Sequence, residues 1–293
     1  TLVVESEELV LEKSFIDIFD DIRTSSDQII NKPESISASI KRVRAVNGGN
    51  LLNLQGQVSF QNGQLIRMRL EAYFNDTEKI RIEITGTGPE QKIALTSDNA
   101  GKVFQMLNLT PNLVGGKLYM EAKYDDDRAG DSLIGHCTVL DFHVTNTPIL
   151  AQLLSISLPT NVFEILSGNG LPFARLQAPF RYTNSSLELI KARATGISLG
   201  ITLNGNIDLD KKSASLNGTI IPAYLLNNIV GTVPVIGDIL TGPEKEGIFA
   251  ATYSARGPTS DLEISVNPLT ALAPGILRDF LNLFLPAKSQ PIQ

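Results

Sequence analysis

The chain has 293 residues and a formal net charge of −6; hydrophobic residues make up 42% of it and charged residues 19%. This is the composition of a globular protein, and the acidic balance excludes a nucleic-acid binder, because neutralising phosphates requires a basic stripe. The single cysteine, Cys137, excludes an internal disulfide, and no apolar run reaches the roughly 20 residues that a transmembrane helix needs.

The N-terminal segment, residues 1–50, begins within a strand pattern at Thr1 and Leu2. We therefore expect it to continue from an upstream stem. Residues 14–30 place apolar side chains at helical spacing, and the basic cluster KRVR at 41–44 is typical of a solvated strand edge. We expect residues 1–50 to be a strand and helix segment, and residues 51–293 to be a second unit.

Apolar and polar residues alternate with a period of two through most of the chain from residue 51 onward. Short Gly, Asn, Asp and Pro clusters interrupt the alternation, as expected for hairpin turns. The fold class predicted is mainly β, with a long antiparallel meander. The expected hairpins join 58–60 to 65–72, 80–86 to 92–97, 117–124 to 133–144, 180–182 to 187–194, 197–209 to 213–220, and 248–255 to 262–266.

Short apolar helices are expected between these hairpins. Pro148 follows Thr147 as a helix-start signal, and the stretch after Pro222 is apolar and broken by Gly231 and Pro234. Such helices suit caps on the open ends of a sheet. The expected helices cover 99–107, 148–158, 161–166, 223–240 and 269–285.

Only one cluster resembles a metal or catalytic site: His136, Cys137, Asp141 and His143. On a strand, His136 and Cys137 point to opposite faces. Cys137 and His143 share a face in a regular strand but lie roughly 20 Å apart, whereas zinc ligands converge within about 2–2.3 Å of one ion. The acidic run at 125–127 is better explained as a hairpin tip than as a calcium loop. We expect no metal, no cofactor and no enzyme activity; catalysis by carboxylates alone stays open.

The apolar strand faces have two interpretations. A half-buried sheet always alternates, so these faces can form a sealed core. They can also line a groove that acyl chains cover. The residues that alternate most regularly, and that we predict to line such a groove, are Leu199, Ile201, Leu203, Ile207, Leu216 and Ile220.

Most of the chain resembles the C-terminal region of the AsmA-like proteins of Gram-negative bacteria, in particular of the large YhdP-type branch found in alphaproteobacteria. The resemblance covers roughly residues 51–284 and is most specific from Asn146 onward. The segments that carry it are GTIIPAY at 218–224, VPVIGDILTG at 233–242, GIFAATY at 247–253, GP at 257–258, VNPL at 266–269, ALAPG at 271–275, and, upstream, SDNAG at 97–101, GGKL at 115–118, DFHVTNTPILA at 141–151, FARL at 173–176, APF at 178–180 and ARATG at 192–196.

The resemblance implies a periplasmic segment of a bridge-like lipid transporter, tethered to the inner membrane by an N-terminal segment. Its sheet would curl into a U-shaped, taco-like groove that carries glycerophospholipids between the inner and outer membranes, with phospholipid acyl chains as the ligand. The alternative is an assembly factor for outer-membrane proteins that acts through sheet edges. The residues expected to contact a membrane or a membrane-protein partner through the terminal helices are Leu225, Leu226, Ile229, Ile236, Leu277, Phe280, Leu281 and Phe284.

Overall fold

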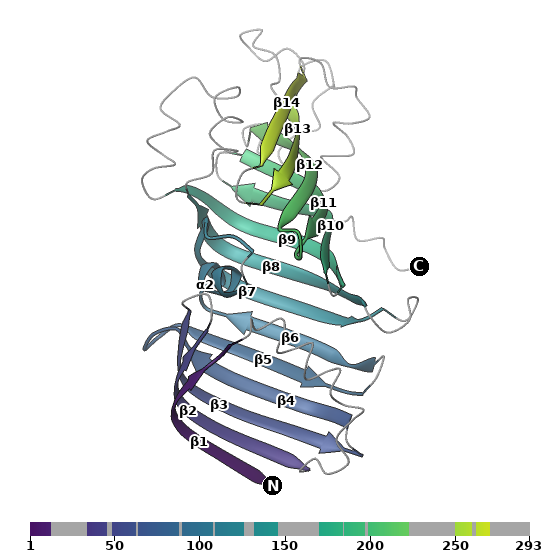
Figure 1. Ribbon diagram of the computed structural model, residues 1–293. Coiled ribbons are helices and arrows are strands. Elements are labelled where there is room, and N and C mark those ends of the chain that lie inside the picture. Colours follow the sequence, from purple (N-terminus) through teal and green to yellow (C-terminus); the bar gives the residue numbers. More distant parts are fainter. Residues whose placement is uncertain are drawn as a thin grey trace, which may run out of the picture.

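The structure, a computed structural model, contains a single sheet of 14 strands whose spatial order is their order in the chain (Figure 1). It describes residues 1–12, 34–45, 49–62, 64–87, 90–107, 109–125, 132–145, 170–183, 185–196, 199–222, 250–259 and 262–269. The strands are β1 (Leu2–Val10), β2 (Ser35–Arg44), β3 (Asn50–Gln61), β4 (Gln64–Tyr73), β5 (Lys79–Thr85), β6 (Lys92–Ser97), β7 (Leu113–Tyr124), β8 (Ser132–Val144), β9 (Leu171–Thr183), β10 (Ser186–Gly196), β11 (Leu199–Asp208), β12 (Ser213–Pro222), β13 (Ala250–Pro258) and β14 (Glu263–Leu269).

The predicted antiparallel meander is confirmed. Every neighbouring pair from β2 to β14 is antiparallel, and over the described residues each of the six expected hairpins pairs as predicted; 197–198 and 248–249 lie outside them. Only β1 pairs in parallel, with Leu2 opposite Ile36. The sheet twists along its length, so that β12 to β14 cross the direction of β3 to β6 at a steep angle (Figure 1).

The basic cluster at 41–44 does not lie on a strand edge, because β1 lies beyond β2. Two acidic side chains of β1 face this cluster. Lys41 Nζ lies 2.7 Å from Glu7 Oε1, and Arg44 Nε lies 2.7 Å from Glu8 Oε1. The strands before and after residue 50 also join in one sheet, since β2 pairs along β3. The division of the chain at residue 50 stays a prediction.

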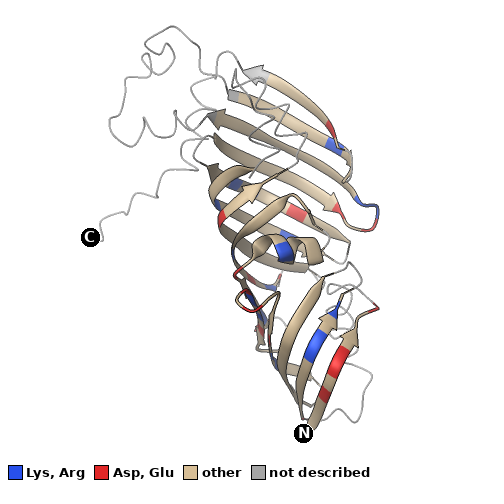
Figure 2. Cartoon of the chain, turned by 90° about the vertical axis from the view of Figure 1, so that its left-hand side faces the viewer, with Lys and Arg blue, Asp and Glu red and all other residues tan. Residues whose placement is uncertain are grey.

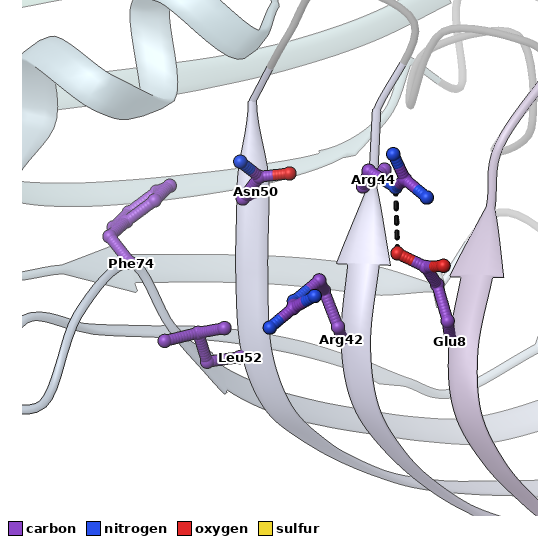
Figure 3. Close-up of a pocket in the computed structure, with 6 residues that line it drawn as sticks. All are labelled: Glu8, Arg42, Arg44, Asn50, Leu52 and Phe74. Carbon is purple, nitrogen blue, oxygen red and sulfur yellow. Dashed lines mark ion pairs between the residues drawn. The ribbon is translucent and has the colours of Figure 1, made fainter.

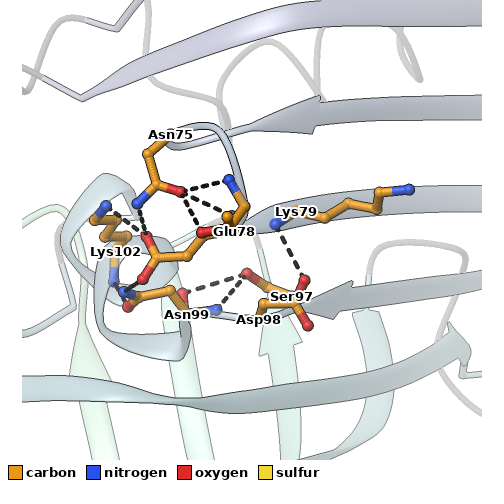
Figure 4. A network of polar contacts seen from close by, with 8 residues as sticks. Asn75, Glu78, Lys79, Ser97, Asp98, Asn99 and Lys102 are labelled. Atoms are coloured by element: carbon orange, nitrogen blue, oxygen red, sulfur yellow. Dashed lines mark hydrogen bonds and ion pairs between the residues drawn. The ribbon is translucent and has the colours of Figure 1, made fainter.

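Helix α2 (Ala100–Met106) confirms the helix expected at 99–107. Asn99 caps it: its Oδ1 accepts from the Lys102 N–H at 3.0 Å, and its Nδ2 donates to Glu78 at 2.8 Å. Glu78 also pairs with Lys102 Nζ at 2.6 Å and accepts from Asn75 at 2.8 Å (Figure 4). This network fixes the start of α2 to the β4–β5 turn, and it places Val103 and Met106 in the core cluster against the sheet.

Three residues other than glycine take a positive φ within described strands: Asn53 (52°), Asp141 (53°) and Lys191 (50°). Register shifts accompany Asn53 and Lys191. A bulge adds a residue to one strand, so residues three apart, such as Leu189 and Ala192, can face the same side of the sheet. Ile190 shows the effect, because it points away from the core and is 36% exposed while nearby Ala192 is buried.

The curling of the sheet into a U stays a prediction, as do the remaining helices. The segments 14–30, 148–158, 161–166 and 223–240 lie outside the described residues, and so does 269–285 after Leu269. Within the described ranges, no helix combines the length and the apolar character required to cross a bilayer.

Candidate functional site: an apolar face along the whole sheet

One face of the sheet carries an apolar row that crosses all 14 strands without a polar residue. Residues directly opposite each other in a ladder point to the same side, so the printed registers trace this row from strand to strand. From β1 to β14 it consists of Leu2, Ile36, Val58, Met68, Ile84, Ile93, Ala122, Gly135, Phe180, Leu189, Gly205, Leu216, Ala255 and Ile264.

A second apolar row runs beside the first, two residues along each strand. It crosses the sheet in the same way, with the bulge at Lys191 carrying it from β9 to Ala192 of β10. It consists of Val4, Ala38, Gly56, Leu70, Ile82, Leu95, Met120, Cys137, Ala178, Ala192, Leu203, Gly218, Tyr253 and Val266. Together the two rows form what we call the apolar face.

The opposite side of the sheet carries a row in which every residue has a polar group. Ion pairs lie along it: Glu71 lies 2.8 Å from both Lys79 and Arg81, and Arg81 shares its row. Charged residues form isolated bands on the cartoon (Figure 2). The row consists of Glu5, Ser39, Gln55, Glu71, Arg81, Thr96, Tyr119, Thr138, Gln177, Arg193, Thr202, Thr219, Thr252 and Asn267.

The apolar face is only partly covered. Several of its largest side chains keep exposed area, whereas a sealed core would bury them. Helix α2 covers the part over β7 and neighbouring strands, and a cavity of ≈ 50 Å³ remains beneath it, between Val103 and Leu70. The half-buried residues are Val58, Leu70, Ile82, Met120, Phe180, Leu189, Leu203 and Leu216.

The six predicted groove residues all lie on this side of the sheet. On β11 and β12 the register sets Ile201 opposite Ile220 and places Leu203 and Leu216 in the two rows. Leu199 and Ile220 are 2% and 1% exposed, so protein already covers them. Ile201, Leu203, Ile207 and Leu216 remain half-buried.

The residues predicted to contact a membrane or partner lie outside the described residues. They are Leu225, Leu226, Ile229, Ile236, Leu277, Phe280, Leu281 and Phe284. Their role stays a prediction.

The prediction that Cys137 and His143 share a face is wrong. Asp141 takes a positive φ between them, and Cys137 and Phe142 both belong to the core cluster. His143 follows Phe142 and therefore points to the other side. Within the described ranges no three His, Cys, Asp or Glu side chains are placed to hold a metal ion. Burial alone raises the pKa of the Cys137 thiol to about 12, which keeps it protonated and unreactive.

Sequence reasoning identified only the C-terminal part of the apolar face. It missed the continuation through β3 to β9, including Met68, Ile82 and Met120. The alternation in 66–72 and 80–84 is regular enough to have shown it. The shared row could not be found in this way, since it depends on the register of each hairpin.

Comparison of the chain with protein-family models, curated protein sequences and solved structures gave no match. The resemblance to AsmA-like proteins therefore stays a prediction.

Proposed function

We propose that this chain is a lipid-carrying segment of a bridge-like transporter, and that glycerophospholipid acyl chains lie along its apolar face. The observation that supports the proposal most directly is the unbroken apolar row from Leu2 to Ile264. A row perpendicular to the strands offers a path along the long axis of the sheet. No step of this function requires catalytic chemistry from the chain.

The energetics suit a carrier without strong selectivity. Aliphatic side chains contact acyl chains without preferred direction, at about 0.8 kcal/mol for each CH₂ removed from water. The row carries no polar residue, so an acyl chain that moves along its half-buried positions exchanges one apolar contact for another; Met68, Ile84, Ile93 and Ala122 within the row are already buried by protein. The polar row on the opposite side keeps that surface in water.

The finer features of the proposal follow from the resemblance to AsmA-like proteins. The sheet would curl along its length so that the apolar face becomes the inside of a U. The protein would work in the periplasm, held to the inner membrane by an N-terminal segment, and would pass lipid toward the outer membrane. The segments 223–240 and 269–285 would meet a membrane or a membrane protein at one end.

A different function is favoured by the edge strand β1. Of the eight large hydrophobic residues exposed in the described part of the chain, five lie on β1: Leu2, Val3, Val4, Leu9 and Val10. An exposed sheet edge accepts a further strand through backbone hydrogen bonds. The alternative is therefore an assembly factor that binds strands of outer-membrane proteins.

Neighbouring residues on β12 allow a sharp test of lipid carriage. Leu216 is half-buried on the apolar face, and Asn217 is exposed on the other. A photoreactive amino acid is placed at each position in turn, the protein is irradiated in cells, and adducts are identified by mass spectrometry. We expect phospholipid adducts at Leu216 and none at Asn217. Equal labelling at both positions, or none at either, would refute the proposal.

The substitution Ile201→Asp separates the two functions. It places a charge on the half-buried apolar face, far from β1 in the strand order. Loss of phospholipid adducts at Leu216 with intact capture of partner strands favours lipid carriage. If the lipid adducts are retained and the capture of partner strands is lost, the result favours the assembly factor. Thr219→Asp, on the polar row of β12, is the matched control.

A further inference from the structure

A second candidate site lies where β1 and β2 end and β3 begins. Six side chains line an open pocket of ≈ 550 Å³ there (Figure 3). The volume is within the range of about 300–1,000 Å³ that small-molecule sites occupy. The pocket is lined by Glu8, Arg42, Arg44, Asn50, Leu52 and Phe74.

The bulge at Asn53 builds this pocket. Leu51 belongs to the core cluster and Leu54 packs against it, so both face the apolar side. Leu52 follows Leu51 directly and therefore faces the other way. On β2, Val43 is 2% exposed, and Arg42 and Arg44 flank it on the opposite side.

The strand register gathers these side chains. Arg42 is the ladder partner of both Glu8 and Leu52, and Arg44 is the partner of Asn50. Arg42 and Arg44 thus lie on one side of the sheet, next to Leu52. Local sequence alone could not show this, because Arg42 and Asn50 lie on different strands.

The charges of the pocket do not cancel. Arg44 Nε lies 2.7 Å from Glu8 Oε1, and this hydrogen bond, with the nearby charge of Arg42, holds the pKa of Glu8 below its ordinary value. Arg42 has no ion-pair partner in the part of the chain that the structure describes. The lining therefore carries a net charge of +1, from two arginines and one glutamate, in a chain whose net charge is −6.

The pocket also has an apolar wall that leads toward the core. Leu52 and Phe74 are both half-buried. Phe74 lines the pocket and also packs against the core cluster of the apolar side. A ligand bound by Arg42 would therefore have an apolar surface within reach of its uncharged end.

We propose that this pocket binds the phosphodiester of an anionic amphiphile, with Arg42 as the bidentate donor and the apolar part of the ligand against Leu52 and Phe74. A guanidinium matches two phosphate oxygens with two parallel N–H bonds. A single net positive charge balances a monoanionic phosphodiester, whereas the carboxylate of Glu8 opposes a doubly charged phosphate. The inference rests on the proposed function for the source of the ligand, a phospholipid headgroup.

The test is calorimetric titration of the whole chain with monomeric dihexanoyl phosphatidylglycerol and, separately, with inorganic phosphate. We expect Arg42→Gln to weaken binding of the phosphatidylglycerol about tenfold or more, since a hydrogen bond to a charged group is lost. Arg42→Lys keeps the charge but not the paired bonds, so an intermediate loss is expected. The matched control is Arg67→Gln, which removes the same charge from an exposed position on β4 outside the pocket.

Each outcome decides the inference. Equal losses in Arg42→Gln and Arg67→Gln mean a general charge effect and overturn it. Inorganic phosphate that binds as tightly as phosphatidylglycerol assigns the pocket to free phosphate and overturns the amphiphile. Absence of saturable binding of phosphatidylglycerol at millimolar concentration also overturns the inference. Labelling at Leu216 is read separately: if it persists while the pocket binds nothing, lipid carriage stands and this inference fails.

Discussion

The hydroxyl of Tyr253 on β13 donates a hydrogen bond to the backbone carbonyl of Thr202 on β11, at 2.9 Å, across the intervening strand β12. The register puts Gly218 of β12 opposite Tyr253, so the ring passes over a residue with no side chain. Next to this contact, the backbone N–H of Thr219 on β12 donates a hydrogen bond to the side-chain Oγ1 of Thr202, at 3.0 Å. This contact links three strands of the apolar face, and burial raises the pKa of Tyr253, which keeps its proton in place.

Substitution of Gly218 should destabilise the protein more than loss of the tyrosine hydroxyl. A Cβ on Gly218 would lie 1.9 Å from the Thr202 carbonyl oxygen and 2.7 Å from the Tyr253 hydroxyl. We expect Gly218→Ala to cost about 3 kcal/mol, as overpacking does, and Tyr253→Phe about 1 kcal/mol, for one hydrogen bond. Urea unfolding measures both. Ser215→Ala, exposed on the same strand, should stay within ~0.5 kcal/mol; a Gly218→Ala value that small would contradict the contact.

Gly101 should control the attachment of α2. A Cβ at this position would lie 2.4 Å from the Leu113 carbonyl oxygen and 3.1 Å from the Gly115 nitrogen, both backbone atoms of β7. We expect Gly101→Ala to push the helix off the sheet, to cost about 1–3 kcal/mol, and to speed amide exchange in 100–107. Gln105→Ala, exposed on the same helix, is the control and should leave exchange unchanged.

Stability should fall in mild acid because two partly buried carboxylates are paired. Hydrogen bonds from Lys79 and then Arg81 hold the pKa of Glu71 below its ordinary 4.5, and Lys102 and then Asn99 do the same for Glu78. A pKa lowered by folding adds stability that is complete above 4.5 and is lost as pH falls through the folded value. We expect the urea concentration at the unfolding midpoint to fall as the pH is lowered below 4.5. We expect it to fall less in the double variant Glu71→Gln, Glu78→Gln.

Glu121→Gln tests whether the dependence of the urea midpoint on acid pH, here called the acid slope, is specific to Glu71 and Glu78. Glu121 is an exposed residue of β7 without an ion pair among the described residues. Its substitution should leave the acid slope as in the unmodified protein. A slope that changes as much in Glu121→Gln as in the double variant would show that overall charge, not these two pairs, sets the response.

Cys137 should resist alkylation until the protein unfolds. It lies in the second apolar row between Met120 and Ala178, and burial raises its pKa to about 12. We expect iodoacetamide at pH 8 to modify an engineered exposed cysteine, Ser215→Cys, well before Cys137 in the same molecule. Both sites should react at similar rates in urea. Peptide mass spectrometry gives the two rates, and equal native rates would place Cys137 in contact with solvent.

Much of the fold could be read from local pattern, because alternation and turn chemistry act within a few residues. The hairpin between β11 and β12 is the clearest case: odd apolar positions from Leu199 to Ile207, the turn at Asp210 and even apolar positions from Ala214 to Ile220 all recur in the register. The short helix after Asn99 was equally local, since its cap and its apolar residues lie within one turn or two.

The positions where the local pattern failed are those that depend on a break in strand alternation or on a neighbouring strand. A regular alternation puts Cys137 and His143 on one face, and only the positive φ of Asp141 separates them. The cluster at 41–44 fits an edge until β1 pairs beyond it. The arginine pocket likewise needs the bulge at Asn53.

The sequence by itself therefore determined the strands, most of their turns and the apolar character of one side, since each follows from the period of two along a strand. The tertiary structure alone decided that 14 strands align their apolar residues in one row from Leu2 to Ile264. The physical reason is that a row is a property of register. Register is set by turn length, bulges and the burial of cross-strand neighbours, and these act between residues far apart in the chain.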